Sequence, residues 1–567
     1  LQRRPPAILT LIVIMGEVFF EVLIPFYTAD MVNMIKAGEA LSAVTALGGK
    51  LVLMAIASLL CGAVAAKTCA DASTGFARNL REDMFTRVQS FAFENIDRFS
   101  SASLVTRMTT DVTNVQMAFM MIIRTAVRAP LMFLFAIIMA FIMGGKLALT
   151  FVVVVPVLVA GLLLIAKNAM PAFRSVFKKY DRLNESIEEN VRGMRVVKGF
   201  AREEYEKEKF RNASDNICKD FTRAERIVAL NAPIMQICIY FNMAFILIVG
   251  SRLVITSQGA QINVGEMSSM LTYGFQILMQ LMMLSMIYVM LTMSAESVRR
   301  IAEVLTEVPA IHNPENAVTE VTDGSIDFEG VSFKYSAKAK KYALSDIDLH
   351  IPSGTTVGIL GGTGSSKSTL VQLIPRLYDV SEGSIKVGGT DVREYDLKTL
   401  RDSVAMVLQK NELFSGTIKE NLRWGNPDAT DEEMIEACKL SQAHEFVTSF
   451  PEGYDTVIDG SGSNLSQGQR QLISIARAAI ANPPVMILDE ATSSIDTRTE
   501  ILVQRGMDSL MQGRTVFVIA HRLSTVMNSD VIMVLERGRI IERGSHDQLI
   551  EEKGRYYQLY TGNFAEG

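Results

Sequence analysis

The sequence predicts a protein in two parts, an all-α membrane domain of six transmembrane helices followed by an α/β domain. Three observations lead to this prediction. Charge-free apolar stretches fill much of the first 300 residues, although charged residues make up 21% of the 567-residue chain. Beyond residue 324, short β-branched segments alternate with helical stretches and glycine turns. One of these segments runs directly into a glycine-rich loop that ends in lysine and serine.

Six apolar stretches are long enough to cross a bilayer, which takes about 20 residues. Their approximate ranges are 6–28, 47–67, 122–143, 147–166, 231–254 and 268–293. We expect helices, because an isolated strand leaves its backbone groups unsatisfied in lipid. The spans exclude a soluble globular protein, a disordered chain and a disulfide scaffold. The five cysteines show no CxxC pair or metal-ligand spacing. Three of them lie in or beside apolar runs, so we expect small core residues.

The charges between the spans predict an orientation. The segments 67–116 and 166–226 are rich in Lys and Arg, whereas the connections 144–146 and 257–265 carry almost no charge. The positive-inside rule places the two basic segments in the cytoplasm. The stripe Leu80, Met84 and Val88 has helical spacing, so the spans are expected to continue as helices into the cytoplasm.

The second part is predicted to be an α/β P-loop NTPase domain. Its expected strands are Val357–Leu360, Val404–Leu408, Val485–Leu488, Val516–Ala520 and Val531–Glu536. Alternating strands and helices are typical of a sheet covered by helices. A polar segment with Pro309 and Pro314 precedes it, which gives a membrane domain at 1–300, a linker at 301–323 and the α/β domain at 324–567. The net charge of −5 gives no reason to expect nucleic acid as a partner.

The glycine-rich loop predicts a phosphate site. A strand runs into the loop and a helix follows it, which is the context of a Walker A loop. Backbone N–H groups would surround the phosphates, Lys367 would contact the β and γ phosphates, and Ser368 would bind Mg²⁺. Ser366 stands where glycine usually precedes the lysine, and its Cβ crowds a backbone that must approach phosphate closely. The loop comprises Gly361, Gly362, Thr363, Gly364, Ser365, Ser366, Lys367, Ser368 and Thr369.

A second acidic motif follows the strand Val485–Leu488. Asp489 fits the Walker B role of holding Mg²⁺, directly or through water. Glu490 comes next and would polarise the attacking water as a general base. Either carboxylate alone is compatible with an ordinary acidic strand end, but the upstream Lys367 favours ATP chemistry.

The segment before Walker B carries a family resemblance. It resembles the LSGGQ signature of ATP-binding cassette proteins, and the whole chain is similar to a bacterial ABC exporter half-transporter of the multidrug and lipid-flippase type. The resemblance implies that Tyr335 stacks on adenine, that Gln409 senses Mg²⁺ as the Q-loop residue, and that His521 is the switch histidine near the γ-phosphate. It also implies a D-loop at Ser494–Asp496 and makes Ser368, Gln409 and Asp489 the metal-binding set. The signature residues are Leu465, Ser466, Gln467, Gly468 and Gln469.

The resemblance implies a dimer. The helix N-terminus after Ser466 offers N–H donors to a phosphate, and in this family that phosphate lies on the opposing cassette. The partner is either a second copy or a paralogous chain. The X-loop departs from the family pattern, because Gly460 and Ser461 stand where it has Glu-Arg, although Asp459 is adjacent. The cytoplasmic helical tips are expected near Ser100–Met108 and Phe200–Tyr205.

Residues in the spans are candidates for substrate contact. Glu17 and Glu21 share one helical face, and ionisable groups in lipid usually face the protein interior. The last span is rich in methionine, including Met279, Met283 and Met286, and methionine surfaces suit varied apolar ligands. The competing interpretations are structural pairing for the carboxylates and helix packing or lipid contact for the methionines.

The predicted function is ATP-driven export of apolar or amphipathic substrates, drug-like compounds or lipids, by alternating access. The predicted cofactors are ATP and Mg²⁺, and the partners are a second half-transporter, membrane lipids and a small apolar or amphipathic substrate. We expect the chain to lie in a bacterial plasma (inner) membrane, with its cassette in the cytoplasm. The alternatives are a lipid or peptide exporter, or an ATP-gated channel or sensor that moves no substrate.

Overall fold

The computed structural model describes residues 4–336, 339–489, 497–520 and 523–561. The chain forms two compact units. The membrane unit consists of residues 1–89 and 101–307, and the cassette unit consists of residues 90–100 and 308–567. Residues 90–100, from the N-terminal half of the chain, therefore fold with the C-terminal half. A single domain boundary in the sequence does not describe this division.

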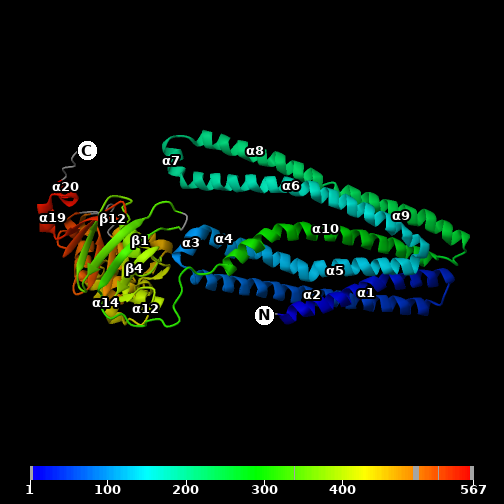
Figure 1. Cartoon of the computed structure of the whole chain (residues 1–567). Coiled ribbons are helices and arrows are strands. Elements are labelled where there is room, and N and C mark those ends of the chain that lie inside the picture. Colours follow the sequence, from blue (N-terminus) through cyan, green and yellow to red (C-terminus); the bar gives the residue numbers. More distant parts are fainter. Residues whose placement is uncertain (1–3, 337–338, 490–496, 521–522, 562–567) are drawn as a thin grey trace. The chain divides into compact units, whose positions relative to one another are not determined.

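The membrane unit is entirely helical in its described residues, and α6 and α8 run side by side, joined by α7 (Figure 1). Its elements are α1 (Arg4–Ala37), α2 (Leu41–Gln89), α4 (Ser101–Thr106), the π-helix η1 (Arg107–Asp111), α5 (Val112–Gly144), the 3₁₀ turn η2 (Gly145–Leu149), α6 (Thr150–Arg192), α7 (Met194–Gly199), α8 (Glu203–Val228), α9 (Asn231–Thr256) and α10 (Val264–Thr306).

Five of the six predicted spans lie within one helix, and the sixth, 147–166, begins in η2 and continues in α6. The helical membrane fold is thus confirmed. By length and composition, five continuous helical stretches are apolar enough to cross a membrane. The number is five because the short turn η2 joins α5 and α6 into one stretch, Ser101–Phe173. The basic segments are helical as expected, since α2, α6 and α8 run far beyond the spans. α10 also continues past the expected boundary at residue 300 to Thr306.

α1, α5 and α10 pack together around buried side chains such as Ile14, Met132 and Ile277. Small residues allow this close approach, because a Cβ at Gly144 would lie 2.4 Å from the Met270 sulfur. Hydrogen bonds add specificity: the Tyr273 hydroxyl donates to the Val22 carbonyl over 2.8 Å. In lipid, such packing and bonding replace the hydrophobic drive that folds soluble helices.

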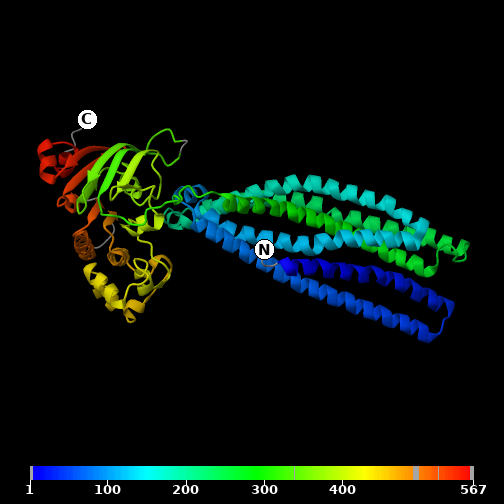
Figure 2. The same ribbon diagram turned by 60° about the horizontal axis from the view of Figure 1, so that its bottom comes forward.

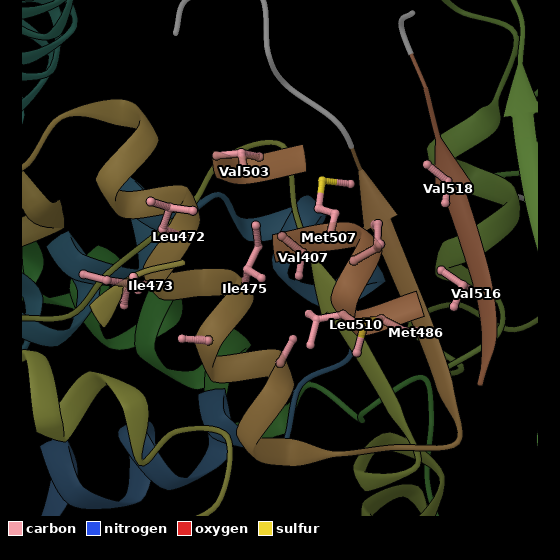
Figure 3. Packing of buried hydrophobic residues seen from close by; sticks show 14 of the residues in the cluster. Val407, Leu472, Ile473, Ile475, Met486, Val503, Met507, Leu510, Val516 and Val518 are labelled. Atoms are coloured by element: carbon pink, nitrogen blue, oxygen red, sulfur yellow. The ribbon is translucent and has the colours of Figure 1, made fainter. Parts of the chain in front are cut away.

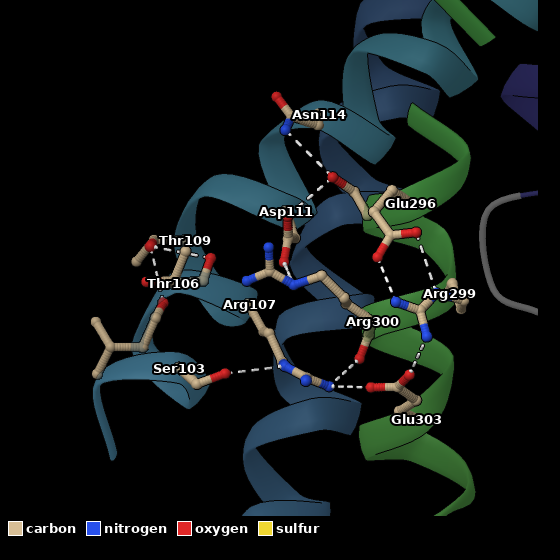
Figure 4. A network of polar contacts seen from close by, with 12 residues as sticks. Ser103, Thr106, Arg107, Thr109, Asp111, Asn114, Glu296, Arg299, Arg300 and Glu303 are labelled. Carbon is tan, nitrogen blue, oxygen red and sulfur yellow. Dashed lines mark hydrogen bonds and ion pairs between the residues drawn. The ribbon is translucent and has the colours of Figure 1, made fainter. Parts of the chain in front are cut away.

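A polar network joins η1 and α5 to α10 near the end of the helices (Figure 4). The buried Asp111 accepts a hydrogen bond from the Ser297 hydroxyl at 2.8 Å and lies 3.1 Å from Arg300 Nε. Arg107 donates to the Arg300 carbonyl at 2.7 Å and pairs with Glu303 at 2.9 Å. These bonds fix η1 and the start of α5 against α10.

The cassette unit is built on two main sheets, with helices around them (Figure 2). The first has the order β2-β1-β4-β5 and the second the order β12-β11-β3-β10-β9-β6, in which only β12 is antiparallel to its neighbour. The strands are β1 (Ile326–Phe333), β2 (Leu344–Ile351), β3 (Thr356–Leu360), β4 (Glu382–Val387), β5 (Thr390–Asp391), β6 (Val404–Val407), β7 (Gly416–Thr417), β8 (Val457–Ile458), β9 (Val485–Asp489), β10 (Thr515–Ile519), β11 (Val531–Glu536) and β12 (Arg539–Gly544).

One core of the cassette unit lies between the second sheet and the helices α16 and α17. Leu472 and Ile475 of α16, Met507 and Leu510 of α17, and Met486 of β9 meet there (Figure 3). The central strands read as nearly continuous apolar runs, because both faces of a parallel sheet are covered. The predicted α/β fold is thus confirmed. The helices are α3 (Phe93–Phe99), α11 (Lys367–Gln372), α12 (Leu397–Asp402), α13 (Ile418–Leu422), α14 (Asp431–Leu440), α15 (His444–Thr448), α16 (Gln467–Ala481), α17 (Thr497–Met511), α18 (Leu523–Val526), α19 (His546–Glu552) and α20 (Arg555–Thr561).

Candidate nucleotide site

The topology gathers the predicted motifs at one edge of the second sheet. The parallel strands β3, β10, β9 and β6 are neighbours in that order. The glycine-rich loop follows β3, Asp489 ends β9, and Gln409 follows β6. Because the carboxyl ends of parallel strands lie at the same edge, these residues come together there, where ligands bind in open α/β sheets.

The glycine-rich loop has the backbone of a tight turn. Gly361 has a φ of +156°, and a Cβ there would lie 2.4 Å from the Leu535 carbonyl oxygen. Ser366 caps α11 with φ 73° and ψ 28°, a left-handed conformation that side chains other than glycine adopt at a cost. The serine therefore occupies a backbone conformation that favours glycine. This is a different reason from the crowding of phosphate that the sequence argument gave.

Lys367 is 7% exposed and lies inside the loop. Its ammonium donates to the carbonyls of Gly361 at 2.8 Å and Gly362 at 3.1 Å. Burial lowers the pKa of Lys367, and the charge of Asp489 opposes that shift. The cation is thus held at the inner surface of the loop, where a phosphate would meet it.

Oxygen donors suited to Mg²⁺ lie beside this lysine. The Ser368 hydroxyl donates to Asp489 Oδ2 over 3.3 Å. A hydroxyl and a carboxylate are ligands that Mg²⁺ accepts next to phosphate oxygens. The neighbouring Ser365 hydroxyl is buried and makes no hydrogen bond within the described residues. The residues present therefore fit a Mg-nucleotide.

An aromatic cluster lies next to the loop. The Tyr335 hydroxyl shares a hydrogen bond of 2.8 Å with Thr369, and its ring is 45% exposed. The ring packs edge-on against Phe333 at 4.9 Å and Tyr378 at 5.2 Å between centroids. Tyr335 is therefore held beside the phosphate loop and remains partly exposed.

The signature segment begins a helix with a capping box. The Ser466 hydroxyl accepts from Gln469 N at 3.2 Å, and the Gln469 side chain accepts from Ser466 N at 2.9 Å. Leu465 and Gly468 are buried, Gln467 is half-buried and Ser466 is exposed. This box fixes the first turn of α16, whose N–H groups carry a partial positive charge.

Comparison with known proteins assigns both parts of the chain to one family of transporters. Residues 7–282 match the family described as the ABC transporter transmembrane region, and residues 344–493 match the ABC transporter family. An uncharacterised ABC transporter ATP-binding protein of Bacillus subtilis, YfiB, is 33% identical over 98% of this chain and 96% of its own. The chain belongs to the ABC transporter family.

Other relatives agree. A fatty acid ABC transporter ATP-binding/permease protein of Mycobacterium bovis is 35% identical over 85% of this chain and 75% of its own. A solved bacterial Atm1-family ABC exporter with ATP bound has the same fold, with a TM-score of 0.83 at 24% identity, over 100% of this chain and 99% of that one. This ABC transporter chain is an ATP-hydrolysing half-transporter with several membrane-spanning helices, and half-transporter exporters function as dimers.

Three predicted residues of the transporter lie outside the described residues: Glu490, Asp496 and His521. In the sequence, Glu490 and Asp496 come after β9, and His521 comes after β10. Gln409 is described and exposed. The side chain of Ser461 in the X-loop is outside the described set, and Gly460 begins a 3₁₀ turn.

Sequence reasoning missed the role of the segment 90–100 in this transporter. The tip expected near Ser100–Met108 borders this segment: residues 90–100 belong to the cassette unit, and residues from Ser101 onward belong to the membrane unit. Within the cassette unit, Asp97 of α3 accepts a hydrogen bond of 2.8 Å from the Tyr378 hydroxyl. Burial, with a smaller contribution from Asp97, raises the pKa of Tyr378 above its usual range. The side-chain amide of Asn95 also donates a hydrogen bond of 3.1 Å to the Val308 carbonyl oxygen.

The structure separates the membrane residues that were expected to share a substrate site. Glu17 and Glu21 of α1 pair with Arg128 of α5 at 3.2 Å and 2.5 Å. Such pairing favours the structural interpretation of the two carboxylates. Met286 of α10 lines a cavity in the membrane unit, whereas Met279, Met283 and the two carboxylates are not among the residues that line it.

Proposed function

We propose that this chain is one half of a dimeric exporter that uses ATP to move apolar or amphipathic molecules, lipids in particular, out across the plasma membrane. The observation that carries the proposal is the fold of residues 90–100 with the cassette. A segment between two membrane helices that is built into the nucleotide-binding unit gives ATP binding a mechanical path to the membrane helices. The name of the mycobacterial relative, a fatty acid transporter, supports a lipid-like substrate.

In the proposed cycle, ATP lies between the Walker A loop of one chain and the signature helix of its partner. Tyr335 stacks on the adenine, and the loop amides with Lys367 hold the phosphates. Ser368 and Asp489, with Gln409, would hold Mg²⁺, which neutralises phosphate charge when bound. Alternating access then requires only that ATP binds the closed state more tightly than the open one.

Hydrolysis resets this cycle. Glu490 orients the attacking water and accepts its proton, and His521 contacts the γ-phosphate from the neighbouring strand end. The partner's N–H groups after Ser466 stabilise the charge that develops on the transferred phosphoryl group. The basic charge of the helical extensions supports a cytoplasmic cassette. The partner is a second copy, unless the irregular X-loop marks a pairing with a paralogue.

The test is reconstitution of the purified chain in lipid vesicles. We expect ATP hydrolysis together with ATP-dependent movement of a fluorescent lipid between leaflets, both lost in Glu490→Gln. Steady hydrolysis without movement of any lipid or amphiphile would contradict export, and ATP-dependent ion conductance would indicate a channel instead. Activity that appears only after a paralogue is added would show a heterodimer.

A further inference from the structure

In the membrane unit, α6 lies beside α8 and α9, and a cavity opens where both sides of this pair are interrupted. Pro171 lies inside α6 and cannot donate a backbone hydrogen bond to the preceding turn. On the other side, residues 229–230 form the turn that separates α8 from α9. The cavity has a volume of about 690 Å³, and Pro171, Leu230 and Ile234 are among its lining residues.

This larger cavity changes from apolar to polar along its length. On α6, its wall begins at Gly161, within a predicted span, and ends at Ser175, about 21 Å away at 1.5 Å per residue. Leu164 lines the part within the span, whereas Asp220 and Arg223 line the opposite end together with Ser175. The end within the span therefore suits a hydrocarbon chain, and the other end suits a polar group.

A second, smaller cavity of about 450 Å³ adjoins the polar end and shares Arg223 with it. Its lining residues belong to α8 and to the turn that follows. They recur every three or four positions, so they share one face of the helix. They include Lys219, Thr222, Arg223, Arg226, Ile227 and Leu230. Three cations and a hydroxyl thus gather beside the larger cavity.

The three cations of this face repel one another. Lys219 and Arg223 are four positions apart, and Arg223 and Arg226 are three apart, spacings at which like charges destabilise a helix. Within the part of the chain that the structure describes, none of the three forms an ion pair. Asp220, the acid next to Lys219 in the sequence, pairs instead with Lys179 of α6 at 2.6 Å. A bound anion would relieve this repulsion.

The two arginines lie at the level of lipid headgroups. α9 and a predicted span both begin at Asn231. Arg226 precedes it by about 8 Å along the helix, and Arg223 by about 12 Å. The headgroup layer on each side of a bilayer is about 5–8 Å thick, and the flexible stem of an arginine carries its charge several Å farther. Both guanidinium groups therefore reach the layer that contains lipid phosphates.

We infer that the two cavities together form a site for an anionic phospholipid, whose phosphate binds Arg223 and Arg226 and whose acyl chain lies between α6 and α9. Guanidinium groups bind phosphate through paired N–H donors, and Thr222 adds a hydroxyl donor. Basic pockets between membrane helices suit anionic headgroups. The apolar end favours a lipid over a free phosphate, which has no chain to bury. Because this lipid stays bound rather than being exported, the inference goes beyond the proposed function.

The experiment counts the lipids that the full-length chain retains when it is released from nanodiscs into a native mass spectrometer. The nanodiscs hold dioleoylphosphatidylglycerol and dioleoylphosphatidylcholine in equal amounts, two lipids with the same tails and different headgroup charge. We expect about tenfold preferential retention of phosphatidylglycerol, because its phosphate charge is not balanced by a choline. Equal retention would overturn the inference. Displacement of the lipid by an equal concentration of soluble glycerol 3-phosphate would also overturn it, since the site would then bind phosphate alone.

Charge reversal locates the site. Lys219→Glu with Arg223→Glu and Arg226→Glu is expected to abolish the preference for phosphatidylglycerol. The same variant should instead retain a cationic lipid with the same tails, dioleoyltrimethylammonium propane, because its phosphate-binding charges are now negative. This gain of a ligand is a result that misfolding cannot produce. A reversed variant that still prefers phosphatidylglycerol would place the lipid elsewhere.

A matched control reverses three cations of the same helix that lie farther from the span. The control is Lys207→Glu with Lys209→Glu and Arg211→Glu, which changes the net charge by the same amount. It is expected to keep the preference for phosphatidylglycerol. Equal loss of the preference in both variants would attribute it to the overall charge of α8 and overturn the site.

Two single substitutions keep the test decisive if a triple variant fails to fold. Arg223→Gln removes the cation that lines both cavities, and Ala172→Phe fills the larger cavity without a change of charge. Each is expected to lower the retention of phosphatidylglycerol several-fold. Unaltered retention in both would overturn the inference. Because retention is measured without ATP, these outcomes do not depend on hydrolysis or on export.

Discussion

Ser366 is a serine in a backbone conformation suited to glycine. Its φ of 73° follows from the loop around the phosphate site, where the chain must turn before α11 begins. A non-glycine residue in this region costs about 1–2 kcal/mol. The conformation persists because β3 and α11 on either side fix the loop.

Ser366→Gly is therefore expected to raise the free energy of unfolding of the cassette by about 1 kcal/mol. It should also tighten ATP binding, because the Cβ no longer crowds the backbone at the phosphates. Chemical denaturation and titration with a fluorescent ATP analogue measure the two effects. Ser366→Ala keeps the Cβ and serves as the control with no gain; a stability loss in Ser366→Gly would contradict the strain argument.

At the scale of the element, the N-terminus of α16 combines two tasks in Ser466. Its hydroxyl caps the helix, and the same end is proposed to face the partner's phosphate. Thr430 makes the same capping box with Glu433 at α14, without any proposed contact to nucleotide. Comparing variants at the two caps therefore distinguishes an effect on helix stability from an effect on catalysis.

Ser466→Ala is expected to lose about 1 kcal/mol of stability and most of the ATPase activity. Ser466→Asp keeps a good cap, so its stability should hold while activity falls, because the carboxylate repels the phosphate. Thr430→Ala should lose similar stability with normal activity. Thermal unfolding and phosphate release measure both quantities. Full activity in Ser466→Asp would exclude the phosphate contact.

The short helix α3 reaches the aromatic cluster of the nucleotide site through one side chain. Tyr378 binds Asp97 through its hydroxyl and packs its ring on Tyr335. It therefore connects the segment between two membrane helices to the residue proposed to hold adenine.

Tyr378→Phe keeps the ring and removes the hydroxyl, so ATP affinity is expected to change less than about twofold. Stimulation of ATPase activity by a transported lipid should drop several-fold, because α3 loses its bond to the cluster. The ratio of activity with and without lipid is the readout. Asp97→Asn, which still accepts a hydrogen bond, should be milder; unchanged stimulation in both variants would show that Tyr378 does not couple the sites.

At the scale of the whole molecule, the described chain carries a Walker A loop and a signature helix that are proposed to act on different nucleotides. Lys367→Met should disable the first and Ser466→Asp the second, so each variant alone should be inactive. In a mixed dimer, one site combines the intact Walker A loop of one chain with the intact signature of the other.

Co-reconstitution of the two inactive chains is therefore expected to restore about a quarter of the unmodified ATPase rate, if subunits mix at random and sites act independently. Phosphate release from the mixture measures this recovery, and each variant alone is its control. No recovery despite mixing, shown by co-purification with two different tags, would contradict nucleotide sites shared between chains.

Much of the fold followed from local patterns. Charge-free stretches of membrane length predicted α1, α2, α5, α6, α9 and α10, since lipid permits little else. Alternation of β-branched runs and helical stretches predicted the second sheet. The Walker A loop was predictable because its residues lie together in the sequence. The tip expected near Ser100–Met108 stays a prediction. The assignment of residues 90–100 to the cassette unit was not predicted, because no local pattern indicates which unit a short amphipathic segment joins.

The sequence by itself determined the type of each element and the chemistry of the nucleotide loop, because both depend on neighbours a few residues apart. The tertiary structure decided which distant side chains meet. It paired Glu17 and Glu21 with Arg128, attached α3 to the cassette, and placed Asn114, Asn231 and Met286 around one cavity. Such meetings depend on the packing of helices far apart in sequence, where only shape and burial select the partner.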